Sequence, residues 1–88
     1  MKAVKVRIFG KVQGVGFRYF LYENAKKLNI KGYAKNLEDG SLEAVFEGKE
    51  EEIEKMIELS KIGPKLAKVE SVEIEEIETK NFKDFKIF

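Results

Sequence analysis

Hydrophobic and charged residues alternate at the start of the chain, from Lys2 to Phe9, where Val4, Val6 and Ile8 are separated by Lys5 and Arg7. A period of two predicts a β-strand with one buried face. A segment containing three glycines, 10–16, follows this strand. Beyond it, apolar residues recur every three or four positions and predict a helix; they are Phe17, Phe20, Leu21, Ala25 and Leu28.

The middle of the chain repeats the two patterns. Segments Lys31 to Lys35 and Leu42 to Glu47 lie on either side of 36–40, whose Asp-Gly pair predicts the turn of a β-hairpin. An amphipathic stretch from about Glu50 to Ile62 predicts a second helix that Gly63-Pro64 ends. Its inward-facing residues are expected to be Ile53, Met56, Ile57 and Ser60.

Two further strands complete the prediction. Apolar residues alternate from Val69 to Ile77, with a bulge expected near Glu75 and Glu76, and the segment Phe85 to Phe88 is expected to add a short strand. The order is therefore βαββαβ plus a short C-terminal strand. Right-handed crossovers then place both helices on one face of a mostly antiparallel sheet. This is an α+β fold, a ferredoxin-like sandwich.

Composition limits what such a fold can do. With 88 residues we expect a single domain, 1–88, and hydrophobic residues at 43% are sufficient for a packed core. The net charge of +1 offers no global attraction for nucleic acid or a membrane. Neither Cys nor His occurs, which excludes thiol chemistry and removes the commonest metal ligand and general base. No apolar run reaches membrane-spanning length, so we expect a cytoplasmic protein, and the Lys- and Glu-rich composition is typical of thermophiles.

The glycine segment and Arg18 suggest an anion site. Glycines between a strand and a helix allow main-chain N–H groups to converge where the helix dipole is positive. Arg18 is a cation in the first turn of that helix, where the dipole disfavours it, and a bound phosphate would explain its presence. The alternatives are a plain tight turn for the glycine segment and, for Arg18, either a snorkelling surface side chain or an ion pair with Glu23. On these residues alone the two interpretations of Arg18 are equally supported.

Two longer motifs resemble the signatures of the acylphosphatase family, in order and in spacing. They are GKVQGVGFR from Gly10 to Arg18 and GYAKNLEDGSLE from Gly32 to Glu43. The resemblance extends over the whole chain and implies an acyl phosphate phosphohydrolase, which splits acyl phosphates into carboxylate and inorganic phosphate. Relatives often have Thr where this chain has Leu21, which puts the rate in question rather than the identity.

The resemblance also implies how the site works. The phosphate would be held by the loop composed of Gln13, Gly14, Val15, Gly16, Phe17 and Arg18, through main-chain amides and the guanidinium. Asn36 would position the attacking water, with no phosphoenzyme and no cofactor or metal, and a substrate phosphate oxygen could accept the proton. Inorganic phosphate would act as a product inhibitor of a monomeric enzyme. We also expect the Phe88 carboxylate to approach and restrain Arg18.

Other functions stay open from sequence. Glu38 and Asp39 could form a magnesium pair, but adjacent acids in a turn usually face solvent. Lysines 26, 27, 31 and 35 are more typical of a solvated face than of a nucleic-acid track, and the aromatic residues Tyr19, Phe20, Tyr22 and Tyr33 lack an RNA-binding pattern. A non-catalytic ferredoxin-like binding module is the main alternative. A domain of the large carbamoyl-transferring hydrogenase maturation factors is another, although the cysteines of their zinc fingers are absent.

Overall fold

The computed structural model describes residues 1–88 and contains the seven elements predicted from the sequence pattern. The helices are α1 (Phe17–Leu28) and α2 (Glu50–Ile62), with the predicted bounds. The strands are β1 (Lys2–Lys11), β2 (Lys31–Asn36), β3 (Leu42–Gly48), β4 (Lys68–Ile77) and β5 (Phe85–Ile87). Several strands run one or two residues beyond the predicted limits, and β2 thereby includes Asn36.

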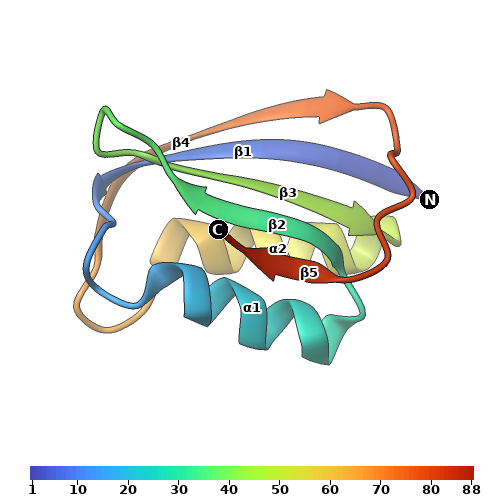
Figure 1. Ribbon diagram of the computed structural model, residues 1–88, viewed down its shortest axis with the longest axis horizontal. Helices are drawn as coiled ribbons and strands as arrows, with labels where there is room; N and C mark the ends of the chain where they lie inside the picture. The colour runs from blue at the N-terminus through green and yellow to red at the C-terminus, as the bar shows by residue number, and fades with distance from the viewer.

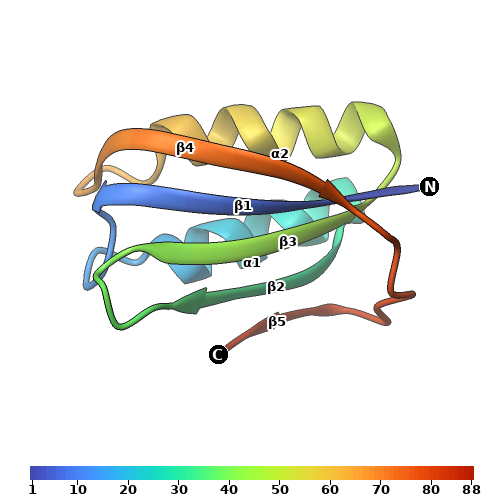
Figure 2. The same cartoon turned by 90° about the horizontal axis from the view of Figure 1, so that it is seen from above.

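All five strands form one sheet in the order β4-β1-β3-β2-β5. Figure 2 shows the strands side by side, from one edge of the sheet to the other. Every pairing is antiparallel except that between β2 and β5, which is parallel. Both helices lie against the same face, as Figure 1 shows, and leave the other face, the open face, free of helices. The ferredoxin-like βαββαβ sandwich with its extra strand is confirmed. Neither helix has the length and apolar character that a membrane crossing requires.

The core fills the space between the sheet and the helices. Val4, Val6 and Ile8 of β1 point into it, as their alternation predicts, and the helices contribute their apolar stripes. Ile53, Met56 and Ser60 of α2 are buried, and Ile57 packs partly against the same cluster.

The bulge expected near Glu75 and Glu76 is wrong. The β1–β4 register is unbroken there and shifts instead between Phe9 and Gly10, where Glu70 is skipped. Gly10 has φ +127°, and a Cβ at this position would lie 2.2 Å from the Lys68 main-chain oxygen, so the shift requires glycine. The two glutamates interrupt the apolar alternation because β4 is an edge strand whose side chains reach water on both faces.

Buried carboxylates organise the open face near β2. Glu43 is 9% exposed; it accepts a hydrogen bond from the Tyr33 hydroxyl (2.8 Å) and lies 3.8 Å from the Lys35 ammonium. Glu47, 3% exposed, accepts hydrogen bonds from the main-chain N–H groups of Lys80 (2.7 Å) and Phe82 (3.2 Å). It therefore fastens the segment that precedes β5 to the sheet.

The Tyr33 phenol provides a spectroscopic test of this arrangement. Burial, and then the hydrogen bond to the Glu43 carboxylate and its charge, raise the pKa of Tyr33 from 10.0 to about 12. The folded protein thus holds this proton more tightly than the unfolded chain, so the stabilisation is complete below pH 10 and is lost as the pH rises through about 12. We expect a tyrosinate absorbance step near pH 12 that Tyr33→Phe abolishes. An identical titration curve for the two proteins would contradict the contact.

Candidate active site

The loop between β1 and α1 exposes main-chain donors. Gly14 and Gly16 have φ of +72° and +81°, a left-handed conformation that other residues adopt only with strain. The N–H groups of Gly14, Val15 and Gly16 donate to no protein oxygen, and the first bond into α1 runs from Phe20 N to Gly16 O (3.0 Å). Gly16 caps α1 without a side-chain hydrogen bond. The loop therefore presents unpaired donors at the positive end of a helix, an arrangement that binds anions.

Arg18 lies in the first turn of α1, which contains no acidic residue. Its Nη1 donates a hydrogen bond to the main-chain oxygen of Phe88, and it forms no ion pair with Glu23. The expected approach of the chain end to Arg18 is thus present as a contact with a main-chain oxygen. Only one nitrogen of the guanidinium is engaged, and the others are free for a ligand.

Asn36 is the last residue of β2, at the mouth of the hairpin. Its Oδ1 is buried and has no hydrogen-bond partner, and it is the only buried side-chain nitrogen or oxygen in the protein that lacks one. Most buried polar atoms in proteins are paired, and leaving one unpaired costs about 1–3 kcal/mol. An orphan acceptor is therefore a site where a ligand or a bound water completes the hydrogen bonding.

These three features meet in one pocket. A cavity of about 190 Å³ is lined by Gly14, Gly16, Arg18 and Asn36, and also by Val12, Phe17, Tyr19 and Ile87. The loop and the guanidinium are adjacent in sequence, whereas Asn36 comes from the end of β2, and the packing of α1 against the sheet brings them together. The volume accommodates a phosphate and a water but little more. A separate cavity of about 640 Å³ on the open face is lined by none of the predicted site residues.

The remaining predicted loop residues lie beside the pocket. Phe17 is buried in the core and also lines the pocket. Val15 packs partly against the core. The Gln13 side chain does not enter the pocket. Its Nε2 donates to the main-chain oxygens of Leu37 (2.7 Å) and Ser41 (3.0 Å) and so ties the glycine loop to the hairpin turn that follows Asn36.

These two bonds join the loop to the turn after Asn36, and we therefore expect Gln13 to be a positioning residue that fixes the distance between the loop and Asn36. Removing the tie with Gln13→Ala is expected to lower kcat for the acyl phosphate hydrolysis that the motif resemblance implies, about tenfold to a hundredfold, since small misplacements of reacting groups are costly. Gln13→Glu, of similar shape but without donors, should be no better. Asn24→Ala is the control, because it also removes one amide-to-carbonyl bond (2.9 Å, to Phe20) but on the outer part of α1. Wild-type kcat in Gln13→Ala would refute this role.

The Asp39 carboxylate forms hydrogen bonds within the hairpin turn. Its carboxylate accepts hydrogen bonds from the main-chain N–H (2.9 Å) and the hydroxyl (2.5 Å) of Ser41 and lies 3.8 Å from Arg7. The Ser41 hydrogen bonds, assisted by the Arg7 charge, lower the pKa of Asp39 below its ordinary value. No group of three acidic side chains that could hold a metal ion occurs in the chain.

Sequence reasoning missed three pocket residues, Val12, Tyr19 and Ile87. Tyr19 is 61% exposed. An aromatic residue that lies next to Arg18 and outside the apolar stripe of the helix was a sequence signal that could have placed it at the pocket. Ile87 could not be found, because its place depends on the parallel pairing of β5 with β2. Leu21 is fully buried and does not line the pocket, so it supplies no polar group there.

Comparison with known proteins gives a consistent result. The acylphosphatase family model matches residues 4–87. The chain is 52% identical over 71 residues to an acylphosphatase of Caldanaerobacter subterraneus subsp. tengcongensis, covering 81% of this chain and 79% of that relative. It is 44% identical over 89 residues to an acylphosphatase of Thermococcus kodakarensis, covering 99% and 98%. The crystal structure of acylphosphatase from Bacillus subtilis superposes with a TM-score of 0.97 at 34% identity, covering 100% of this chain and 99% of that one.

Proposed function

Because this chain belongs to the acylphosphatase family and is an enzyme that hydrolyses acyl phosphates, we propose that its Gln13 to Arg18 loop binds the phosphoryl group and that Asn36 holds the attacking water. The single observation that carries this assignment is the shared pocket: Asn36, whose buried amide oxygen has no protein partner, lines the same cavity as Arg18 and the glycines with free main-chain donors. The substrate is a small molecule. Membership of an enzyme family replaces the hypothesis of a non-catalytic binding module.

The phosphoryl oxygens are bound by two kinds of donor. The unpaired N–H groups of Gly14, Val15 and Gly16 surround them on one side, and the start of α1 adds its dipole. The Arg18 guanidinium supplies a full positive charge and parallel N–H groups that match phosphate oxygens. Phosphoryl transfer needs this charge stabilisation more than it needs a covalent partner, so the absence of His and Cys is no obstacle.

Asn36 orients the nucleophile. A water that donates one hydrogen to the orphan Oδ1 is fixed with its lone pair free for attack on phosphorus. In-line displacement requires that the acyl oxygen leaves on the opposite side of the phosphorus atom. Water must therefore lie between Asn36 and the phosphate, with the acyl group directed away from the end of β2.

The bonds balance without an acid or base from the protein. The water oxygen forms a bond to phosphorus while the bond from phosphorus to the carboxyl oxygen breaks, and the electron pair leaves with the carboxylate. A proton of the attacking water passes to an oxygen of the phosphoryl group that it attacks, which becomes inorganic phosphate. A carboxylate is a stable leaving group and needs no protonation, and because water attacks phosphorus directly no phosphoenzyme forms.

The proposal extends to the properties that follow from this site. Inorganic phosphate, which fits the same donors, inhibits as a product. A monomer is sufficient, because every group invoked comes from one chain. A cytoplasmic location suits a protein without cysteine.

Hydrolysis of benzoyl phosphate, followed by its loss of absorbance, tests the proposal. We expect turnover in the presence of excess EDTA and competitive inhibition by inorganic phosphate, because amides and Arg18 do the binding. Activity that requires a divalent cation, or phosphate inhibition that is not competitive, would contradict the site as assigned.

A further inference from the structure

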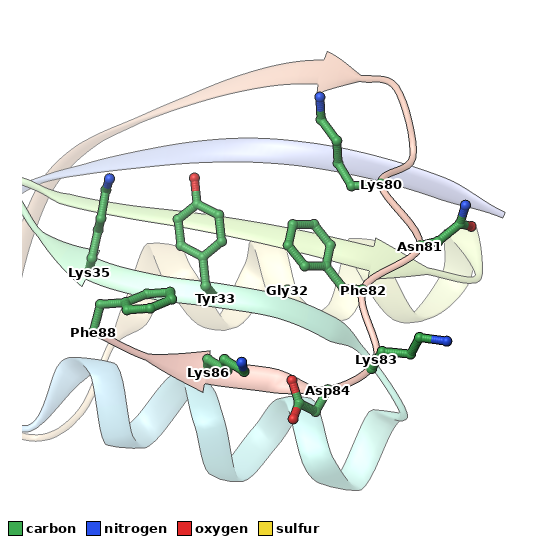
Figure 3. Close-up of a pocket in the computed structure, with 10 residues that line it drawn as sticks. All are labelled: Gly32, Tyr33, Lys35, Lys80, Asn81, Phe82, Lys83, Asp84, Lys86 and Phe88. Atoms are coloured by element: carbon green, nitrogen blue, oxygen red, sulfur yellow. The ribbon is translucent and has the colours of Figure 1, made fainter.

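A hollow of about 640 Å³ lies outside the active site on the open face, between β2, β5 and the segment that precedes β5. Figure 3 shows its lining. Tyr33 of β2, Phe82 of the segment that precedes β5, and Phe88 contribute aromatic rings, and lysines lie around them. Its volume is in the range of pockets that hold small organic ligands.

Three aromatic rings form its apolar floor. Tyr33 lies between Phe82 and Phe88, at ring-centroid distances of 6.0 Å and 5.8 Å and interplanar angles of 67° and 72°. Phe88 is 64% exposed, so this cluster is not completed by the protein's own core. The Tyr33 ring is held in place because its hydroxyl donates a hydrogen bond to Glu43. The Glu47 carboxylate holds the main chain of Phe82 by accepting a hydrogen bond from its N–H group. The ring surfaces are thus prearranged and partly open to solvent.

The rim of the hollow is cationic. Lys35, Lys80, Lys83 and Lys86 line it together with one acid, Asp84. Of these lysines only Lys35 is paired with a carboxylate, at 3.8 Å from Glu43, and it also lies 5.8 Å from the centre of the Tyr33 ring. Lys80 and Lys86 are exposed and form no ion pair. Unpaired ammonium groups around an apolar floor favour a ligand that is both flat and anionic.

We propose that this hollow binds a small aromatic phosphate of the mononucleotide class, with its base against Tyr33, Phe82 and Phe88 and its phosphates on Lys80 and Lys86. Base stacking on aromatic side chains and charge-assisted hydrogen bonds to phosphate act together in such recognition. Neither part is sufficient by itself, since exposed lysines alone bind anions weakly.

This site is separate from the catalytic pocket. The two cavities share no lining residue, although Lys35 precedes Asn36 and Phe88 follows Ile87. Neighbouring residues in a strand point to opposite faces of a sheet, so Lys35 and the Phe88 ring lie on the open face while Asn36 and Ile87 face the catalytic pocket. The acyl group of the substrate leaves away from Asn36 under the proposed mechanism and does not account for the hollow.

Titration of the ¹⁵N-labelled protein with ATP, in the absence of divalent metal, tests the proposal by NMR. We expect saturable shifts of the Tyr33, Phe82 and Lys86 amides, with a Kd below about 1 mM. Adenosine, which has the ring without the charge, and tripolyphosphate, which has the charge without the ring, should each bind at least about tenfold more weakly.

Matched variants locate the binding. Lys80→Gln with Lys86→Gln is expected to weaken ATP about tenfold, and so is Phe82→Ala, which retains the main-chain bond to Glu47. Lys27→Gln with Lys49→Gln is the control; these unpaired lysines line a hollow of about 280 Å³ without aromatic residues, and their removal should leave the Kd unchanged. Folding of each variant is checked from its amide spectrum. No saturable shift up to about 10 mM ATP, shifts confined to residues 14–18, or equal weakening by both lysine pairs would overturn the proposal.

Discussion

Replacing Asn36 by alanine is expected to lower kcat for benzoyl phosphate about a hundredfold to a thousandfold, the range seen when one positioned polar group is removed from a reaction centre. The physical reason is that the Oδ1 which orients the water is lost, while the amides and the guanidinium that bind phosphate are untouched. Steady-state kinetics checks the rate, and a circular dichroism spectrum checks the fold.

The same substitution makes a second, less intuitive prediction about stability. Because Oδ1 of Asn36 accepts no hydrogen bond from the protein, removing it breaks no hydrogen bond within the fold. Asn36→Ala should therefore unfold at the same or a higher denaturant concentration than wild type. Asn24→Ala, which loses an existing hydrogen bond to Phe20 on α1, is the matched asparagine control and should keep full activity. A variant with wild-type kcat, or one that unfolds markedly earlier, would show that Asn36 is a structural turn residue.

Replacing Arg18 by alanine is expected to abolish phosphate inhibition and to lower kcat/KM about a thousandfold or more, as for other arginines that stabilise a phosphoryl transition state. The change removes the only full charge among the side chains of the pocket. Arg18→Lys keeps the charge but not the planar fork, so we expect an intermediate loss in kcat/KM. Benzoyl phosphate kinetics with and without inorganic phosphate measures both effects.

The contact between Arg18 and Phe88 adds a control to this experiment. Loss of Arg18 also frees the Phe88 main-chain oxygen, and a reduced stability could be mistaken for a catalytic effect. Unfolding of Arg18→Ala is therefore measured beside its kinetics. A folded Arg18→Ala protein in which phosphate still competes with the substrate would contradict the assignment of this residue.

Much of the fold was predictable because local pattern and tertiary packing agree. The stripe from Phe17 to Leu28 and the stripe with Ile53 and Met56 both face the core, and both helices end at the residues the sequence indicates. The β1 alternation likewise survives intact. Strand irregularity was not predictable from pattern, because the shift at Gly10 depends on how closely β4 approaches β1, which only the assembled sheet determines.

The candidate site was predictable where one segment determines it. The glycine loop and Arg18 are adjacent in sequence, so helix dipole and amide arguments apply directly. Asn36 by itself resembles an ordinary turn residue, and only the motif connected it with the loop. The Gln13 bonds to Leu37 and Ser41, and the place of Ile87, arise from pairing across the sheet and leave no trace in local composition.

Phosphate affinity in the Asn36→Ala protein, measured by isothermal titration calorimetry, tests the central claim most directly. If the loop and Arg18 bind phosphate and Asn36 only positions water, the Kd for inorganic phosphate should match that of wild type within about twofold, while turnover is lost. A Kd raised in parallel with the loss of kcat would mean that binding and water positioning are not divided between these residues.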